Sequence, residues 1–321
     1  MKKLINLDCS LRDGGYYNNW DFSDKFINNY LKVLESVNVE YCELGFRFIN
    51  NSGFKGSCAF TSEKFINSLE IPSKLKIAIM INGSDVIENN SLNFEVIKKL
   101  IPVKANESKI KLIRVACHSE SIEKILPFFD FLAEQGYLSA CNITQISEKT
   151  ADQLSKISSL LSNSKVNIIY FADSLGSLIP NQIKNIYKSI RNNWSGPIGI
   201  HAHDSQGLAL SNTIEAMKND ITWLDSTITG IGRGPGNTKT EELIVELDNF
   251  LNRNTNLVLL IKIINEQFKP LKDKYLWGTN IFYYLAGKYA IHPSYVQSML
   301  TDFRYEEEDI LASINYLKNK S

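Results

Sequence analysis

Two histidines stand two residues apart in the stretch I-G-I-H-A-H-D, residues 198 to 204. The β-branched run around them predicts a strand, and side chains alternate between the two faces of a strand, so His201 and His203 should point the same way. Two buried imidazoles are costly to leave unpaired, and one metal ion satisfies both neutral rings. Because the chain has only 4 histidines, the pair predicts a metal site, with hydrogen-bonded core histidines as the alternative.

A carboxylate ligand for the same ion is expected in D-C-S-L-R-D-G-G-Y, residues 8 to 16. A catalytic divalent ion held by two histidines needs at least one anionic ligand and keeps open positions. Asp13 is the best candidate, because the first strand of a closed barrel lies close to the seventh and eighth. Alone, Arg12 and Asp13 would suggest a surface ion pair or an Asp-Gly turn. With the histidines they favour a site, around which Gly14 and Gly15 would let a loop turn.

A second glycine-rich segment, G-I-G-R-G-P-G-N at residues 230 to 237, comes directly before a predicted helix. Glycine permits positive φ angles and close approach of backbone to a ligand, and a helix N-terminus can receive a carboxylate. Gly234 and Gly236 are therefore candidate substrate contacts, with an ordinary strand-to-helix turn as the alternative. The segment is not a dinucleotide fingerprint, because it follows the last predicted strand and no acidic residue follows about 20 positions later.

The scaffold for these segments is indicated by short β-branched runs that alternate with longer segments of helical apolar spacing. Eight runs are predicted as strands, at residues 5–9, 41–46, 76–81, 110–117, 137–143, 166–172, 198–203 and 223–228. Eight strand-helix units over about 250 residues match a (β/α)8 TIM barrel better than an open doubly wound sheet. We expect residues 1–255 to form the barrel and residues 256–321 a helical C-terminal extension.

Composition narrows the kind of partner. The chain has 321 residues, 44% of them hydrophobic, which is enough for a sizeable core. Lys+Arg and Asp+Glu are both 35, with no block of like charge, so nucleic acid and anionic membranes are not expected partners. No apolar run reaches about 18 residues, the start is too short for a signal peptide, and five cysteines without a C-x-x-C pair indicate no disulfide framework. We expect a cytoplasmic protein that acts on a small molecule.

In a (β/α)8 barrel the working residues lie at the C-terminal ends of the strands. His118 is a candidate for acid-base work there, with a hydrogen-bonded structural histidine as the alternative. Arg47 is a candidate for gripping a carboxylate or phosphate, with a solvated loop arginine as the alternative. Asn142 and Asp173 are expected to bind substrate or to support the residues that do.

Three motifs, taken together, resemble those of the DRE-TIM metallolyase superfamily in order and separation: D-C-S-L-R-D-G-G-Y, I-H-A-H-D and G-I-G-R-G-P-G-N. The resemblance covers roughly residues 4 to 250. That superfamily includes 3-hydroxy-3-methylglutaryl-CoA lyase, isopropylmalate and homocitrate synthases, and 4-hydroxy-2-oxovalerate aldolase. The aldolase branch is the most similar, through I-R-V-A-C-H-S-E at 113–120, G-Y-L-S-A-C-N at 136–142 and A-D-S-L-G at 172–176.

The resemblance implies that Asp13, His201 and His203 bind a divalent metal, with Asn237 as a further candidate ligand. It also implies that Arg12 stabilises the charge of an enolate. Both roles suit a 2-oxo acid whose keto oxygen and carboxylate meet a Lewis acid, since a guanidinium adds fixed positive charge where the enolate oxygen develops. Mn²⁺ is the expected ion, and Mg²⁺, Zn²⁺ or Co²⁺ would also suit these ligands.

The sequence departs from the resemblance at Tyr16. The hydroxy-oxovalerate aldolases have an acid-base histidine at this position, and the condensing synthases typically have a glutamine. The general base therefore stays open between Tyr16, His118, a water on the metal and an aromatic residue from the C-terminal segment. Packing is an equally good interpretation of Tyr16.

The implied activity is a metal-dependent aldolase that forms or cleaves a 4-hydroxy-2-oxo acid through the enolate of pyruvate or a similar acid. The alternatives are a Claisen-type synthase that uses an acyl-CoA, a lyase like 3-hydroxy-3-methylglutaryl-CoA lyase, and a non-catalytic metal-binding scaffold. In relatives a helical C-terminal region covers the barrel mouth, and in the aldolase branch it docks a partner dehydrogenase. We therefore expect residues 256–321 to act as a lid or homodimer element.

Overall fold

Eight parallel strands close into a barrel in the computed structural model, which describes residues 3–49, 52–302 and 304–319. Their order around the barrel is β1-β10-β9-β8-β7-β6-β3-β2. This confirms the predicted (β/α)8 fold, and each strand overlaps its predicted run. The strands are β1 (Ile5–Asp8), β2 (Tyr41–Phe46), β3 (Lys76–Asn82), β6 (Ile110–Cys117), β7 (Leu138–Ile143), β8 (Ile168–Asp173), β9 (Ile198–Ala202) and β10 (Trp223–Ser226).

The strands form because their runs are apolar on both faces, as parallel strands covered by helices require. One set of side chains fills the barrel interior and includes Leu7, Ala78, Leu112, Tyr170 and Trp223. The alternate set packs outward against the helices in the main hydrophobic core. At the C-terminal ends of the strands, the side chains that point into the barrel become polar.

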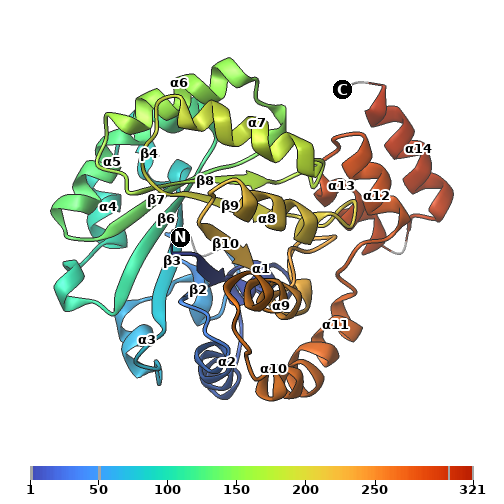
Figure 1. Cartoon of the computed structure of the whole chain (residues 1–321), viewed down its shortest axis with the longest axis horizontal. Helices are drawn as coiled ribbons and strands as arrows, with labels where there is room; N and C mark the ends of the chain where they lie inside the picture. The colour runs from blue at the N-terminus through green and yellow to red at the C-terminus, as the bar shows by residue number, and fades with distance from the viewer. Residues whose placement is uncertain (1–2, 50–51, 303, 320–321) are drawn as a thin grey trace.

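Helices surround this barrel (Figure 1). Ser23 caps α2, because its hydroxyl accepts a hydrogen bond from Phe26 N at 3.3 Å. Gly136 follows α5 with a φ of +83°, the left-handed conformation that commonly ends a helix. The helices are α1 (Ser10–Asn18), α2 (Asp24–Ser36), α3 (Glu63–Ser68), α4 (Phe94–Leu100), α5 (Ile122–Glu134), α6 (Ala151–Ser162), α7 (Pro180–Arg191), α8 (Ala209–Lys218) and α9 (Thr240–Leu251).

The segment after β1 is a helix, α1, and the loop that we predicted from Gly14 and Gly15 was wrong. Both positions inside the helix require glycine, because neighbouring side chains fill the space that a Cβ would occupy. A Cβ on Gly14 would lie 2.5 Å from Ile231 Cδ1, and one on Gly15 would lie 1.9 Å from Trp20 Cδ1. The glycines therefore bring α1 close to its neighbours, which places the side chains of its first turn at the barrel mouth.

Short elements link the larger ones. An antiparallel pair that the sequence did not indicate, β4 (Ile87–Glu88) and β5 (Ser91–Leu92), lies between β3 and α4. Short 3-10 helices span Ser57–Ala59, Gly83–Val86, Ala105–Glu107, Ser119–Ser121, Ile146–Glu148 and Ile228–Gly230. Apart from Ala105–Glu107, which lies between α4 and β6, these turns carry the chain from the strand ends into the helical layer.

The C-terminal region has two parts. α10 (Val258–Ile263), a π-helical turn (Ile264–Phe268) and α11 (Lys269–Tyr275) follow the barrel, and Leu260 and Phe268 join its main core. α12 (Ile281–Lys288), α13 (Pro293–Leu300) and α14 (Glu307–Lys318) share a smaller apolar cluster of their own. Figure 1 shows these three helices as a lobe at one side of the barrel. A domain boundary at residue 255 stays a prediction. No helix in the described ranges is long and apolar enough to cross a membrane.

Candidate active site

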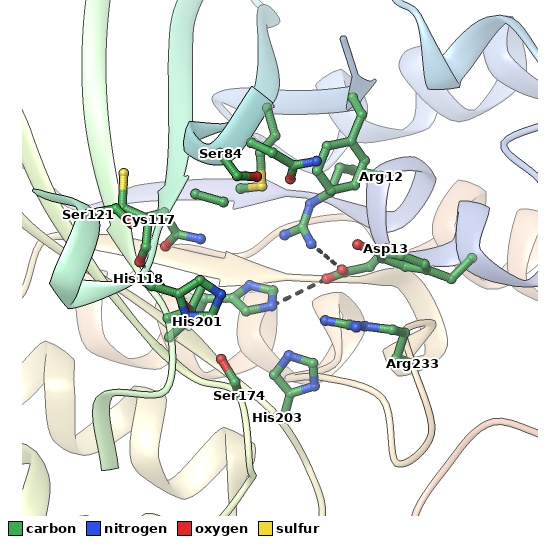
Figure 2. A pocket seen from close by; sticks show the side chains of 18 residues that line it. Arg12, Asp13, Ser84, Cys117, His118, Ser121, Ser174, His201, His203 and Arg233 are labelled. Atoms are coloured by element: carbon green, nitrogen blue, oxygen red, sulfur yellow. Dashed lines mark hydrogen bonds and ion pairs between the residues drawn. The ribbon is translucent and has the colours of Figure 1, made fainter. Parts of the chain in front are cut away.

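A cavity of about 180 Å³ opens at the C-terminal ends of the strands, as expected for this fold (Figure 2). Seven strands or their following segments, together with the loop after β10, contribute to it. Its walls contain Arg12, Asp13, Tyr16, Phe46, Met80, Asn82, Ser84, Ala116, Cys117, His118, Ser121, Asn142, Thr144, Ala172, Ser174, His201, His203 and Arg233.

Asp13 is the only carboxylate among the described residues that line the cavity, and it meets four polar side chains, of which Cys9 approaches its Oδ2 with Sγ at 3.7 Å. Its Oδ2 lies 3.3 Å from His201 Nε2 and accepts a hydrogen bond from Asn237 Nδ2 at 2.7 Å. Its Oδ1 pairs with the guanidinium of Arg12. Burial opposes the charge, but Arg12 and the two histidines lower the pKa of Asp13 to about 2. Asp13 is therefore ionised at neutral pH and available as a ligand.

His203 supplies a second nitrogen beside His201. The two ring centroids are 5.1 Å apart, both residues line the cavity, and Figure 2 shows both side chains on the same side of the site as Asp13 and Arg233. Burial, with the neighbouring His201, lowers the pKa of His203 well below the usual range, so its ring is neutral. Neutral imidazole is the form that binds metals.

Two buried atoms at this place have no hydrogen-bond partner among the described residues, His203 Nδ1 and Asn237 Oδ1. Buried polar atoms without partners are costly, so each of these two atoms is a candidate to bind a ligand. With the carboxylate of Asp13 and the Nε2 of His201 they form a donor set of two nitrogens and two oxygens. That set fits a divalent transition metal with open positions, so the residues present suit the ion that the resemblance implies.

A ring of buried charges holds His201 and Arg12 in place. Asp225 Oδ2 accepts a hydrogen bond from His201 Nδ1 at 2.9 Å and from Arg114 Nη2 at 2.6 Å. Glu43 Oε2 accepts from Arg114 Nη1 at 3.2 Å and from Arg12 Nε at 2.7 Å. Asp225 therefore fixes the tautomer of His201 and leaves Nε2 free to face Asp13, as second partners do at metal-binding histidines.

Arg114 and Asp225 were missed by sequence reasoning. Each is a charged residue inside an otherwise apolar strand, and this pattern was a usable signal because charged residues are rarely fully buried unless they are paired.

Cys9 lies on the buried side of the histidine. Its Sγ is 3.9 Å from His201 Nδ1, and Asp225 lies beside the same nitrogen, so these three residues also form a compact group of potential ligands. Burial and the neighbouring Asp13 raise the pKa of the Cys9 thiol well above its usual range, and metals bind the thiolate. Since Nδ1 already donates to Asp225, the ion is better placed on the cavity side, at Nε2.

Arg12 keeps one donor for a ligand. Its Nε and Nη1 contact Glu43 and Asp13, while its buried Nη2 has no hydrogen-bond partner in the described structure. Despite burial, these two carboxylates raise the pKa of Arg12 well above its usual range. A fixed cation with one free N–H group beside a metal site is an arrangement that can stabilise an oxyanion.

The cavity mouth carries Tyr16, His118 and Arg233. The guanidinium of Arg233 lies over the Tyr16 ring, 4.6 Å from its centroid, and Figure 2 shows Arg233 directed into the same space as Asp13 and His203. His118 is exposed at the opposite rim, where its Nδ1 lies 3.2 Å from Thr144 Oγ1. Among the described residues, none after Arg233 in the sequence lines this cavity. The C-terminal aromatic residues therefore contribute no base here.

Arg47 does not join this group. It is 5% exposed, and its guanidinium donates to Leu100 O at 2.8 Å and to the carbonyl of Thr61, and pairs with Glu63 at 3.0 Å. These contacts tie the loop after β2 to α3 and α4. The structure thus corrects the expectation that Arg47 grips substrate, because its donors are already used.

Asp173 is also away from the cavity walls. Its two carboxylate oxygens accept hydrogen bonds from Ser177 N and Leu178 N, each at 3.0 Å. Burial raises its pKa to about 6 against these hydrogen bonds. Asp173 therefore holds the turn after β8. Asn142, for which we expected the same role as for Asp173, lines the cavity.

Gly234 and Gly236 shape the loop after β10 and do not line the cavity. Both have positive φ, +56° and +77°, and a Cβ on Gly236 would lie 2.0 Å from Gly230 O. Gly234 O accepts a hydrogen bond from Gly278 N at 3.0 Å, in the C-terminal region. They position Asn237 and Arg233, so the expected direct contact with substrate is replaced by a role in holding the loop.

Comparisons with known proteins show the family of the chain. A sequence model of the HMGL-like family matches residues 3–265. A 4-hydroxy-2-oxovalerate aldolase from Bacillus cereus is 22% identical over 97% of this chain and 90% of its own length. An oxaloacetate decarboxylase from Mycobacterium tuberculosis is 23% identical over 77% of this chain and 70% of its own length.

Solved structures show the same fold. The N-terminal domain of a candidate aldolase from Bacteroides vulgatus is 31% identical, with a TM-score of 0.81 over 97% of this chain and 100% of that one. Hydroxymethylglutaryl-CoA lyase from Pseudomonas aeruginosa is 16% identical, with a TM-score of 0.65 over 84% of this chain and 93% of that one. At that lower identity the likeness shows the fold alone.

Proposed function

Because the chain belongs to the HMGL-like family, we propose that it is a divalent-metal-dependent aldolase acting through a pyruvate-type enolate. Its substrate is a 4-hydroxy-2-oxo acid, which it cleaves or forms. The observation that carries this proposal is the group of Asp13, His201 and His203 around one cavity, beside an unpaired N–H group of Arg12. Relatives named 4-hydroxy-2-oxovalerate aldolase and oxaloacetate decarboxylase are both carbon–carbon lyases, which supports the same class.

The residues proposed to hold the metal are Asp13, His201 and His203, with Asn237 Oδ1 as a further ligand. When bound, the ion would supply Lewis-acid polarisation of the keto oxygen and carboxylate of the 2-oxo acid. Mn²⁺ is the proposed ion, because two imidazoles with carboxylate and amide oxygens suit Mn²⁺, Co²⁺ and Zn²⁺ and are less typical of Mg²⁺.

Arg12 would bind the oxygen on which enolate charge develops. Glu43 and Asp13 hold its other donors, so Nη2 is fixed in direction before substrate arrives. A donor that is already oriented needs no rearrangement as charge appears, and this is the main source of its catalytic effect. Arg233 is the second cation at the cavity and has no carboxylate partner among the described ion pairs, so it is the proposed contact for the substrate carboxylate.

His118 is the proposed proton carrier. Histidine is the side chain that most often moves protons near neutral pH, and Thr144 orients this ring at the cavity rim. Although Tyr16 is 37% exposed, the surrounding protein desolvates its phenol and raises the pKa, so Tyr16 is a neutral hydroxyl that can donate a hydrogen bond and is poorly suited to remove a proton. Tyr16 also packs against Trp20, with ring centroids 4.9 Å apart, so it combines packing with a place at the mouth.

We also propose a cellular location, an oligomeric state and a partner for this enzyme. We place the enzyme in the cytoplasm as a homodimer, with residues 256–321 acting as a lid or dimer element, and with a dehydrogenase as a partner that would consume a reactive aldehyde product. The lid role is supported by contacts of the C-terminal region with the loops at the barrel mouth. Thr279 Oγ1 donates to Ser205 O at 2.9 Å, and Trp277 Nε1 donates to Thr229 O at 3.1 Å.

The test is cleavage of 4-hydroxy-2-oxovalerate by protein that has been stripped of metal and then reloaded with Mn²⁺. Pyruvate release, followed with lactate dehydrogenase, should depend on the added ion and should be lost in Asp13→Asn. Equal pyruvate release by wild type and Asp13→Asn would contradict the proposal. Thiol release from acetyl-CoA in the presence of a 2-oxo acid would instead indicate the Claisen-type alternative, which the tyrosine at position 16 leaves open.

A further inference from the structure

One side of the cavity is rich in uncharged hydrogen-bonding groups. Asn82 and Ser84 come from the end of β3, Asn142 and Thr144 from the end of β7, and Ser174 from the end of β8. In Figure 2, Ser121 and His118 also lie across the cavity from Asp13 and Arg233. We call these seven residues the polar wall. Charge is concentrated on the metal side of the cavity, so the two sides are suited to different parts of a substrate.

Asn142 is the most informative member of the polar wall. It is 4% exposed, and its Oδ1 has no hydrogen-bond partner among the described residues. A carboxamide offers two donors and two acceptor positions. A buried amide oxygen that lines a cavity without a partner is therefore an acceptor reserved for a ligand or for water in the cavity.

The neighbouring hydroxyls also keep bonding capacity. Ser174 Oγ accepts a hydrogen bond from Gln145 N at 3.0 Å, which leaves its O–H free to donate. Thr144 Oγ1 lies 3.2 Å from His118 Nδ1 and 3.3 Å from Cys117 O. These contacts orient the groups at the ends of neighbouring strands, and a fixed direction makes them selective for a partner with hydroxyls of its own.

We propose that the second substrate, which accepts the enolate, is a short hydroxyaldehyde whose hydroxyl groups bind the polar wall. This inference rests on the proposed aldolase activity and narrows it. In the condensation, C3 of the 2-oxo acid bonds to the aldehyde carbon, and the proton removed from C3 is balanced by the proton gained by the new hydroxyl. No oxidant or further reactant is needed.

An alkyl aldehyde of the same size would be accepted poorly for a physical reason. It would displace water from Asn142 and the hydroxyls without replacing the lost hydrogen bonds, and a site built around such bonds rejects analogues that lack them. The apolar part of the lining, such as Met80 and Ala172, lies on adjacent strand ends and can pack against the carbon chain in either case. The hydroxyl groups therefore decide the preference.

Glycolaldehyde and propanal form a matched pair for the test, because each has four heavy atoms and they differ by a hydroxyl in place of a methyl. With pyruvate and Mn²⁺, the kcat/KM for glycolaldehyde should exceed that for propanal by about 10²-fold in wild type. The readout is the ratio of the two values, because any general loss of enolate formation affects both aldehydes equally and cancels.

Asn142→Leu should lower this ratio at least about tenfold, and Ser174→Ala should lower it by a smaller factor. Met80→Leu is the matched control, since it alters the apolar lining of the same cavity without removing a hydrogen-bonding group, and it should leave the ratio near the wild-type value. If Asn142→Leu folds poorly, Ser174→Ala still gives the direction of change.

The outcomes separate the inference from the proposed function. Deuterium uptake into the pyruvate methyl group together with a preference for propanal would overturn the hydroxyaldehyde inference and leave the aldolase proposal standing. A ratio unchanged by both Asn142→Leu and Ser174→Ala would likewise overturn the assignment to the polar wall. Absence of methyl exchange and of product with either aldehyde would overturn both.

Discussion

At the scale of single residues, Arg12 and Asp13 are neighbours with separable tasks. Asp13 lies beside His201 and is one of the proposed metal ligands. Arg12 is held by Glu43 and keeps its Nη2 for the reacting oxygen. A change at Asp13 should therefore affect metal binding, and a change at Arg12 should affect the reaction rate.

Arg12→Gln should keep the metal content of wild type and lower kcat by about 10²- to 10³-fold, the usual cost of losing an oxyanion donor. Metal analysis and steady-state kinetics on the same preparation check this. Asp13→Asn is the matched variant and should lose metal and activity together. If Arg12→Gln also loses its metal in proportion to activity, the assignment of Arg12 to the enolate is wrong.

Asp173 gives a pH prediction for the metal-free protein. Its pKa is raised to about 6 from the ordinary value near 3.8, so the folded state binds the proton more tightly than the unfolded state. The stability gained from that proton is fully present below about pH 4 and is lost as pH rises through about 6. At about 1.4 kcal/mol per pK unit, wild type should lose about 2 to 3 kcal/mol relative to Asp173→Asn between these limits.

Urea unfolding at pH 4.5 and pH 7.5, followed by circular dichroism, measures that difference. The quantity compared is the change in unfolding free energy between the two pH values in each protein, which removes any constant effect of the substitution. A difference between wild type and Asp173→Asn that stays constant with pH would show that folding does not raise the pKa of Asp173.

The sequence predicted the position of a side chain where a rule of spacing between nearby residues applied. A period of two predicts that His201 and His203 share a face, and both line the cavity. Their partner Asp225, and Arg114 behind it, depend on contacts between residues 24 and 111 positions apart. No spacing rule encodes such a contact, so the buried ring of charges emerged only with the tertiary structure. The roles of these residues in catalysis stay predictions.

At the scale of elements, the loop after β10 depends on its glycines. Gly236 lies directly before Asn237, and its carbonyl accepts a hydrogen bond from Asp204 N at 2.9 Å. Since any side chain at position 236 would collide with Gly230 O, the loop can hold Asn237 beside Asp13 only with glycine there.

Gly236→Ala should therefore destabilise the fold and weaken Mn²⁺ binding at least about tenfold, because the loop must shift. Gly207→Ala is the matched control, since Gly207 has a similar φ of +70° but no atom within 4 Å of an added Cβ. It should cost only the backbone strain of about 1 to 2 kcal/mol. Calorimetric titration with Mn²⁺ and urea unfolding compare the two, and equal metal affinity in both variants would argue against the loop's role.

The prediction of a loop in place of α1 was wrong because it considered local conformation alone. Paired glycines favour turns when only local conformational freedom is considered, whereas Gly14 and Gly15 are set by the side chains of Ile231 and Trp20 that press against them. The eight strands were predictable because each apolar run is long enough to be recognised without knowledge of its neighbours.

At the scale of the whole molecule, the C-terminal region bears on the site through the loop after β10. Trp277 is 3% exposed, donates a hydrogen bond to Thr229 O, and packs against Tyr17 at 5.9 Å between ring centroids. The sequence predicted helices after residue 255 but could not predict where they dock, because docking depends on loops far away in the chain.

Trp277→Ala should lower the free energy of unfolding by about 3 to 5 kcal/mol, as large-to-small changes of buried aromatic residues do, and should reduce activity by loosening the loop. Leu276→Ala is the control, since Leu276 is 77% exposed and should change stability by less than about 0.5 kcal/mol. Thermal unfolding and kcat/KM are measured for both. Similar effects in the two variants would mean that the C-terminal region does not support the site through Trp277.

The central claim is that this barrel uses a metal bound by Asp13, His201 and His203 to form the enolate of a 2-oxo acid. The most direct test is deuterium uptake from ²H₂O into the methyl group of pyruvate, followed by proton NMR without any aldehyde. We predict uptake that requires added Mn²⁺, disappears with chelator, and is absent in Asp13→Asn. Uptake that persists without metal, or no uptake by metal-loaded wild type, would contradict the claim.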